Sequence, residues 1–259
     1  SVPYELVDSD IENQFCPSID RYKSPGSHQR TLMLLSNPCN PTGITRTGAD
    51  LEALVAAAST PSCGLLIDEA YEMFHRPPIS ALAHIDDINQ NNIFVIGAAT
   101  KGLQSPGIRI GWAIAAKHHI EVLGNFSSFG MGGVSHPSQC YALELMAPRR
   151  IEQVRKAVPA FYGQQRQRYG EAFEKMGLRL FTGDGGFYHW CQLPDGINAA
   201  QLNSRLFSDG AAILRGSDCD MRRLDHQSPL RNFFRFSFGP LAPESFEEDI
   251  EILARALNS

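Results

Sequence analysis

The chain has 259 residues, which is enough for one large domain or for a large and a small one. A formal net charge of −5 argues against nucleic-acid binding, which needs clustered Lys and Arg, and no apolar run reaches the ~18 residues of a membrane span. The six cysteines form no Cys-x-x-Cys pair, which favours a reducing compartment, so we expect a cytoplasmic protein.

The first half of the chain predicts strands that alternate with helical or loop connections. Near-continuous apolar runs occur at residues 31–36, 64–68, 92–98 and 111–116, as expected of strands covered on both faces. Residues 45–59 predict a helix with Leu51, Leu54, Val55 and Ala58 on one stripe, and the proline-rich residues 75–90 predict a loop. This alternation predicts an α/β fold with a mostly parallel, doubly wound sheet.

The second half has a different pattern. Residues 136–146 and 150–177 predict long helices, with a kink or break at Pro159. Strand-like runs follow at 178–183, 185–194, 211–216 and 232–239. Helices are expected between and after them, at 198–210 and 243–257. We therefore expect a large domain over residues 1–155 and a small C-terminal α+β domain over residues 156–259.

Polar side chains follow three of the predicted strands, at the point where each strand ends. They are Asn40, then Asp68 and Tyr71, then Lys101. Ligands of a doubly wound sheet bind outside the carboxyl ends of its strands, so these residues are candidates for one site. Taken singly, each has a structural alternative: "NPCNPTG" is rich in turn formers, Asp68 could be a helix N-cap, and Lys101 could extend into solvent.

Lys101, Asp68 and Arg109 together meet one chemical need. A primary amine can form a Schiff base in a dry, shaped site. A carboxylate keeps a pyridine nitrogen protonated, so that the ring acts as an electron sink. An arginine suits a phosphate group better than a lysine does. These three functions describe pyridoxal phosphate.

The stretches "NPCNPTG", "LLIDEAY" and "TKGLQSPGIRIGW", with "GGFYHW" and "FFRFSFG" further on, resemble class I/II aminotransferases, a fold-type I group of pyridoxal-phosphate enzymes. The resemblance runs nearly from end to end. It implies transfer of an amino group between an amino acid and a 2-oxo acid through a Schiff base on Lys101.

The resemblance also implies roles for the remaining residues. Asp68 would pair with the pyridinium nitrogen, and Tyr71 and Asn40 would hydrogen-bond the phenolic oxygen of the ring. Thr100 fits the family pattern before the lysine, and Arg109 would bind the phosphate. Arg235 would grip the substrate carboxylate; its alternative is an exposed strand charge. The family often has a serine where this chain has Ala98.

Family members carry an N-terminal arm and further strands before this point, and full-length members are expected to be homodimers. Here "PYELVDSD" (residues 3–10) resembles the third strand of the large domain, so we expect an N-terminally truncated chain. Two alternatives stay open: another enzyme with the same cofactor, such as a β-lyase or a cyclase, and the aminotransferase-like sensor domain of a transcription regulator. The histidines show no metal-ligand spacing, so we expect no metal.

Overall fold

The structure, a computed structural model, describes residues 3–22 and 30–259. Contacts divide the chain into two compact units. Unit 1 comprises Ser1–Phe15, Asn40–Ile44 and Ala160–Ser259, and unit 2 comprises Cys16–Cys39 and Thr45–Pro159. Each unit is therefore built from segments that are separate in the sequence, and each is described by itself.

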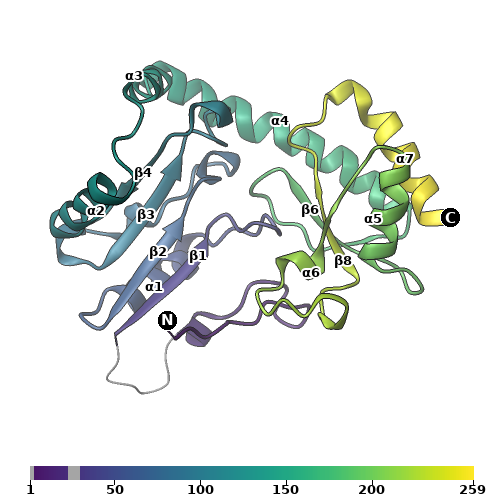
Figure 1. Cartoon of the computed structure of the whole chain (residues 1–259), viewed down its shortest axis with the longest axis horizontal. Coiled ribbons are helices and arrows are strands. Elements are labelled where there is room, and N and C mark those ends of the chain that lie inside the picture. Colours follow the sequence, from purple (N-terminus) through teal and green to yellow (C-terminus); the bar gives the residue numbers. More distant parts are fainter. Residues whose placement is uncertain (1–2, 23–29) are drawn as a thin grey trace. The chain divides into compact units, whose positions relative to one another are not determined.

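The sheet of unit 2 has four strands, in the order β1-β2-β3-β4 (Figure 1). They are β1 (Thr31–Ser36), β2 (Cys63–Asp68), β3 (Ile93–Ala98) and β4 (Gly111–Ile114). The first three are parallel, and β4 runs antiparallel to β3. All four lie within or next to the predicted apolar runs, so the prediction of a mainly parallel α/β sheet is confirmed.

One face of this sheet is packed against α1 (Gly48–Ala58). The predicted stripe of four residues on α1 is fully or almost fully buried, at 3% exposure or less, and it joins a cluster with the inward side chains of the strands, which include Met33, Ile67 and Val95. Burial of this stripe against the sheet contributes to the hydrophobic stabilisation of unit 2.

The connection between β2 and β3 contains three short 3-10 helices: η2 (Glu72–Phe74), η3 (Ala81–His84) and η4 (Ile88–Gln90). The prediction of a loop here is therefore confirmed. Glu69 holds this connection, because its Oε1 accepts a hydrogen bond of 2.6 Å from the backbone N–H of Ala81. Ser80 caps the start of η3 by accepting from the N–H of Leu82.

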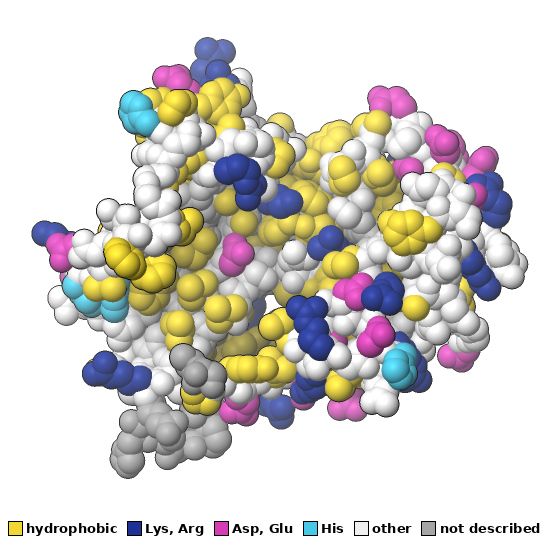
Figure 2. All heavy atoms as spheres, in the orientation of Figure 1, with side chains coloured by type: hydrophobic (Ala, Val, Ile, Leu, Met, Phe, Trp, Pro, Cys, Tyr) yellow, Lys and Arg dark blue, Asp and Glu magenta, His cyan; other side chains and the backbone are white. Residues whose placement is uncertain are grey.

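Apolar side chains are exposed elsewhere on unit 2. The helix α2 (Lys117–Gly130), which we did not predict, buries none of its residues, and Phe126 and Phe129 are 69% and 93% exposed. Leu32 and Leu34 of β1 are 56% and 72% exposed. Figure 2 shows hydrophobic side chains gathered over this sheet and over α2. The helix α3 (His136–Leu145) follows α2 in the chain.

The sheet of unit 1 is antiparallel, in the order β5-β6-β8-β7. Its strands are β5 (Arg179–Leu180), β6 (Tyr188–Gln192), β7 (Leu214–Arg215) and β8 (Phe233–Ser237). Its helices include α5 (Ala199–Ser208), α6 (Gly216–Cys219) and α7 (Phe246–Asn258), and short 3-10 helices lie at η6 (Asp225–Gln227) and η7 (Pro243–Ser245). The predicted mixture of strands and helices in this region is confirmed.

A buried histidine joins this sheet to the helix α4 (Pro148–Lys175). His189 of β6 is 2% exposed; its Nδ1 lies 3.0 Å from Oγ1 of Thr182, and its Nε2 lies 2.9 Å from the carbonyl oxygen of Arg166 on α4. The carbonyl can only accept, so Nε2 carries the proton and donates. Burial lowers the pKa of His189 to about 4, so the ring is neutral at neutral pH.

Two predictions of local structure are wrong. The first is the break at Pro159, because α4 continues from Pro148 to Lys175; the kink given as its alternative stays a prediction. Residues 3–10 form no strand. Contacts within unit 1 explain the second result: Phe15 packs against Trp190 and Phe233, and Asp8 forms an ion pair with Arg222.

No helix of the described residues is long and apolar enough to cross a membrane. The compact units group residues 1–15 and 40–44 with the C-terminal part of the chain. The division into a domain of residues 1–155 and a domain of residues 156–259 remains our proposal for how the polypeptide is organised along its sequence.

Candidate active site

Lys101 lies in a tight turn that follows β3. The turn is closed by a hydrogen bond of 3.1 Å from the N–H of Ser105 to the carbonyl of Ala99, and Gln104, at a positive φ of 53°, donates its backbone and side-chain N–H groups to the carbonyl of Lys101. The Nζ of Lys101 lies 5.9 Å from the centroid of the Tyr71 ring. The structure therefore brings the predicted amine and the predicted tyrosine together.

Asp68 is the last residue of β2, where it pairs with Ser36 of β1 and Ile96 of β3. Its side chain is exposed, and Oδ1 accepts a hydrogen bond of 2.9 Å from the N–H of Ala70. This bond holds the carboxylate at the carboxyl end of the sheet. Since β2 and β3 are parallel and adjacent, the Lys101 turn begins at the same edge.

Arg109 lies between the 3-10 helix η5 (Pro106–Ile108) and β4, in the left-handed conformation, with φ 53° and ψ 50°. A residue with a side chain adopts this conformation at some energetic expense, and such residues often mark functional sites. Nη1 of Arg109 donates to the carbonyl of Pro106 at 2.9 Å, and the side chain is otherwise exposed. Because Gly111 pairs with Ala98, Arg109 lies beside the Lys101 turn, which also contains Thr100.

The loop "NPCNPTG" is divided between the two units. In unit 2, the buried Asn37 exchanges two hydrogen bonds with the backbone of Arg46, at 2.7 and 3.1 Å. In unit 1, Nη1 of Arg235 donates to Oδ1 of Asn40 at 2.8 Å. The prediction that Asn40 belongs with the strand ends of the first sheet stays untested. The contact that the structure does give it is with the predicted substrate-binding arginine.

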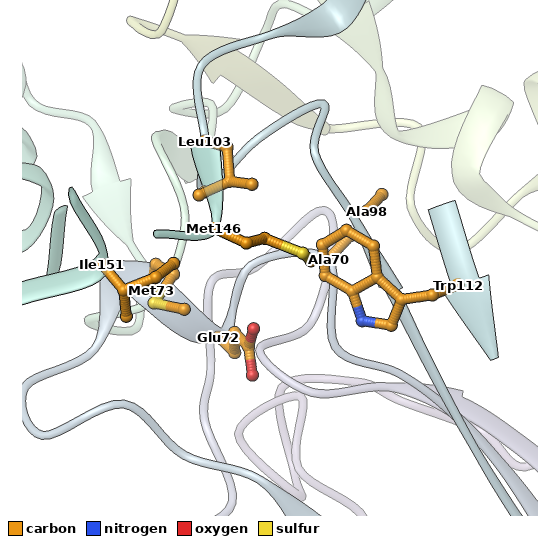
Figure 3. A pocket seen from close by; sticks show the side chains of 9 residues that line it. Ala70, Glu72, Met73, Ala98, Leu103, Trp112, Met146 and Ile151 are labelled. Atoms are coloured by element: carbon orange, nitrogen blue, oxygen red, sulfur yellow. The ribbon is translucent and has the colours of Figure 1, made fainter. Parts of the chain in front are cut away.

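A pocket of about 200 Å³ lies beside the Lys101 turn in unit 2 (Figure 3). Its lining is mostly apolar and comes from η2, the end of β3, the start of β4 and the region where α3 gives way to α4. Glu72 is the one ionisable residue among the described residues that line it, and burial raises the pKa of this carboxyl, against an opposing effect of Arg155. Without a cation, this pocket does not suit a phosphate group.

A larger pocket, of about 540 Å³, lies within unit 1 between residues 6–12 and residues 219–222. Residues 219–222, with Pro229 and Leu230, thus form one wall of this pocket. Asp8 and Arg222 form an ion pair across it. Asp220 is 5% exposed, and its carboxylate accepts from the hydroxyl of Ser228 at 2.6 Å.

Sequence reasoning missed the buried acid next to Asp68. Glu69 is 2% exposed, and burial raises the pKa of its carboxyl to about 7, with smaller contributions from Glu72 and Asp68. The available signal was the acidic pair "DE" at the end of a strand. Neighbouring residues of a strand point to opposite faces, so one of the two acids had to face the core.

The chain belongs to the family of class I and II aminotransferases, whose model matches residues 2–256. It is similar to an LL-diaminopimelate aminotransferase of Aquifex aeolicus, at 25% identity over 78% of this chain and 52% of that protein. It is also similar to an uncharacterized HTH-type transcriptional regulator of Bacillus subtilis, at 26% identity over 84% of this chain and 45% of that protein.

Among solved structures, a double mutant of Thermus thermophilus aspartate aminotransferase has a TM-score of 0.82, at 22% identity. The match covers 96% of this chain and 63% of that chain. This likeness confirms the predicted fold. The chain spans about half the length of the curated relatives that it matches.

The residues of unit 2 fit pyridoxal phosphate, the cofactor that the family implies. The sheet edge offers an amine next to a buried aromatic ring, an exposed carboxylate fixed by the backbone, and an arginine in a constrained conformation. These groups match the aldehyde, the pyridine nitrogen and the phosphate of the cofactor, respectively. Ala98, the last residue of β3, lacks the hydroxyl that many family members have there.

Proposed function

We propose that this protein is a pyridoxal-phosphate-dependent aminotransferase that moves an amino group between an amino acid and a 2-oxo acid. The observation that carries the proposal is the amine of Lys101 beside the Tyr71 ring, in a chain whose match to the family covers residues 2–256. Pyridoxal phosphate, when bound, supplies an electron sink for the bonds at the substrate α-carbon.

Each of the proposed site residues then has a defined role. Lys101 is the point of covalent attachment by a Schiff base and carries protons at its Nζ. Asp68 keeps the pyridine nitrogen protonated, and Tyr71 and Asn40 donate to the phenolic oxygen. Thr100 and Arg109 bind the phosphate, and Arg235 binds the substrate carboxylate.

The buried ring of Tyr71 supports the role of Lys101. Tyr71 is 7% exposed and packs against Phe74, and the Nζ of Lys101 lies 5.9 Å from the centroid of its ring, so the amine has an apolar neighbour on one side. A primary amine acts as a nucleophile only in its neutral form, which a less hydrated environment favours.

The first test is the absorbance of the chain mixed with pyridoxal phosphate. We expect a visible absorbance band that Lys101→Ala abolishes, because no other residue is proposed to attach the cofactor. The matched control is Lys117→Ala, since the side chain of Lys117 is 85% exposed at the start of α2. A band of normal intensity in Lys101→Ala would contradict the proposed attachment.

The second test distinguishes transfer from other outcomes of the same chemistry. With an amino acid and 2-oxoglutarate, transfer gives glutamate, whereas a lyase gives ammonia and a 2-oxo acid. Ammonia without glutamate would favour the β-lyase alternative.

We also propose a cytoplasmic homodimer that contacts neither nucleic acid nor membrane through this chain.

The similarity to a transcriptional regulator supports a second candidate, a sensor domain that binds the cofactor or an amino acid without turnover. The same experiment separates the two. Cofactor absorbance that depends on Lys101, without glutamate formation from any of the common amino acids, would favour the sensor.

A further inference from the structure

Among the residues that the structure describes, Arg235 is a partly buried cation that has no acidic partner. It lies on β8, and among the described residues no carboxylate lies within ion-pair distance of its guanidinium. Nη1 donates to the neutral amide oxygen of Asn40 at 2.8 Å, and the buried Nε has no hydrogen-bond partner in the described part of the chain. A partly buried cation with an unsatisfied N–H is suited to an anion that comes from outside.

The ring of Tyr188 lies under this guanidinium. Cζ of Arg235 is 4.4 Å from the ring centroid. On β6 and β8, Tyr188 pairs with Ser237 and Trp190 pairs with Arg235, so Tyr188 and Arg235 are diagonal neighbours on one face of the sheet. Arginine stacks readily on aromatic faces, because its planar, weakly hydrated cation matches the negative face of the ring.

The ring itself is fixed by its surroundings. Tyr188 is 3% exposed, and the edge of its ring meets Phe187 at a centroid distance of 4.7 Å. Phe187 in turn packs so closely over Gly239 that a Cβ at this glycine would lie 2.4 Å from the Phe187 ring. A buried ring with neighbours this close is a rigid support.

We propose that Tyr188 is a positioning residue, whose ring fixes the plane of the Arg235 guanidinium so that the N–H groups not bonded to Asn40 receive a ligand carboxylate. This inference rests on the proposed function, in which Arg235 binds the carboxylate of an amino acid or a 2-oxo acid. The ring and the amide of Asn40 together orient the arginine before the ligand arrives, so less conformational freedom is lost on binding.

The alternative is that Tyr188 only fills the core of unit 1. Three substitutions separate the two roles. Tyr188→Phe keeps the ring and removes the hydroxyl, while Tyr188→Leu removes the ring. The matched control is Phe234→Leu, because Phe234 is fully buried on the same strand as Arg235 but points to the opposite face of the sheet.

The experiment uses the full chain labelled with ¹⁵N at arginine, and it follows the Nε–Hε signal of Arg235 by NMR. The signal is assigned from its loss in Arg235→Lys. We expect a ring-current shift of this signal in the wild type, Tyr188→Phe and Phe234→Leu, and no such shift in Tyr188→Leu. A change in overall stability does not produce this pattern.

The same signal is then followed during titration with 2-oxoglutarate, with the dimethyl ester of 2-oxoglutarate as the uncharged control. We expect the wild type, Tyr188→Phe and Phe234→Leu to reach half-saturation at similar concentrations, and Tyr188→Leu to need about tenfold more ligand. The inference is overturned if Tyr188→Leu and the wild type reach half-saturation at the same ligand concentration. It is also overturned if Phe234→Leu needs as much more ligand as Tyr188→Leu does.

The two proposals fail in different ways. In the first case, Lys101→Ala keeps the cofactor absorbance of the wild type, while the Arg235 signal of the wild type responds to 2-oxoglutarate. This result contradicts the proposed function and supports the role of Tyr188. Normal cofactor absorbance with no response of Arg235 to 2-oxoglutarate contradicts the role of Tyr188 and leaves Lys101 in place.

Discussion

Glu69 and Asp68 are neighbours at the end of β2, and they face opposite surroundings. The carboxylate of Asp68 is exposed at the edge of the sheet, whereas that of Glu69 lies in the interior and accepts from the N–H of Ala81. One strand end thus supplies both an exposed acid, which we propose for the cofactor, and a buried acid that fixes the following connection. Burial raises the pKa of the Glu69 carboxyl to about 7.

Glu69 should make the stability of the chain depend on pH. Its carboxyl takes up protons more readily in the folded chain than in the unfolded chain, where its pKa is near 4.5. The folded state therefore binds more protons between about pH 4.5 and pH 7, and the free energy of unfolding falls as the pH rises through this range. Complete expression of this difference corresponds to about 3 kcal/mol.

Urea unfolding at pH 5 and pH 8 measures this contribution. We expect Glu69→Gln to lose less stability than the wild type between the two values, since the amide keeps an oxygen for the N–H of Ala81 and has no charge to desolvate. Glu52→Gln, at an exposed position of α1, is the control and should behave as the wild type does. An unchanged pH dependence in Glu69→Gln would mean that Glu69 is not the source.

Among the elements, α4 shows most clearly that a helix can tolerate an unfavourable residue. Pro159 has no N–H to donate to the carbonyl of Arg155, and its ring crowds that carbonyl, yet the helix continues to Lys175. The aromatic residues that follow give the reason. Tyr162, Tyr169 and Phe173 are each buried at 6% exposure or less, so packing of the second half of α4 outweighs the local defect.

Replacement of this proline should stabilise the chain. We expect Pro159→Ala to raise the free energy of unfolding by about 1–3 kcal/mol, because it restores one backbone hydrogen bond and removes a steric clash. Thermal unfolding followed by circular dichroism measures the change. Pro148→Ala is the matched control, because Pro148 lies in the first turn of the helix, where a backbone N–H has no partner within the helix. This substitution should therefore give no gain. Equal effects of the two substitutions would contradict this explanation.

The elements also show what the sequence can predict. The four strands of unit 2 and α1 were predicted because their apolar runs and stripe are continuous. The helix α2 was missed because Gly124, Asn125 and Ser128 interrupt its apolar positions with weak helix formers. Residues 3–10 were expected to form a strand because they resemble a strand of the family, but tertiary contacts decide their structure.

The candidate site was predictable to a similar degree. The spacing of Lys101 and Arg109 after a strand is a local pattern, and the structure keeps both in the connection between β3 and β4. The stacking of Arg235 on Tyr188 joins residues 47 positions apart on two strands, and no local pattern encodes such a contact. The burial of Glu69 depends likewise on the packing of the distant η3.

At the scale of the whole chain, the exposed apolar surface of unit 2 is the dominant feature (Figure 2). It includes Phe126 and Phe129 of α2 and Leu34 of β1. Most monomeric proteins expose apolar side chains singly and not as a large patch. We therefore expect the isolated chain to bind a hydrophobic dye and to associate at high concentration.

Charged substitutions on α2 test this expectation. Phe126→Glu combined with Phe129→Glu should reduce dye fluorescence and association at least twofold, with little change in the melting temperature, because both side chains are already exposed. The control is Asn125→Glu combined with Ser128→Glu, which adds the same charge to the same helix and keeps the apolar side chains. Equal effects of the two double variants would attribute the result to charge alone.

The close approach of two backbones in unit 1 has a consequence for any survey of substitutions. Gly43 has a φ of +71°, and a Cβ there would lie 2.3 Å from the carbonyl oxygen of Gly185, while a Cβ on Gly183 would lie 2.3 Å from that of Gly43. In a deep mutational scan, positions 43 and 183 would score as intolerant as Lys101, although neither needs to touch a reactant. A ranking by fitness alone would thus mix positions that are needed for folding with positions that are proposed for the reaction. A separate assay of the abundance of folded protein would distinguish the two.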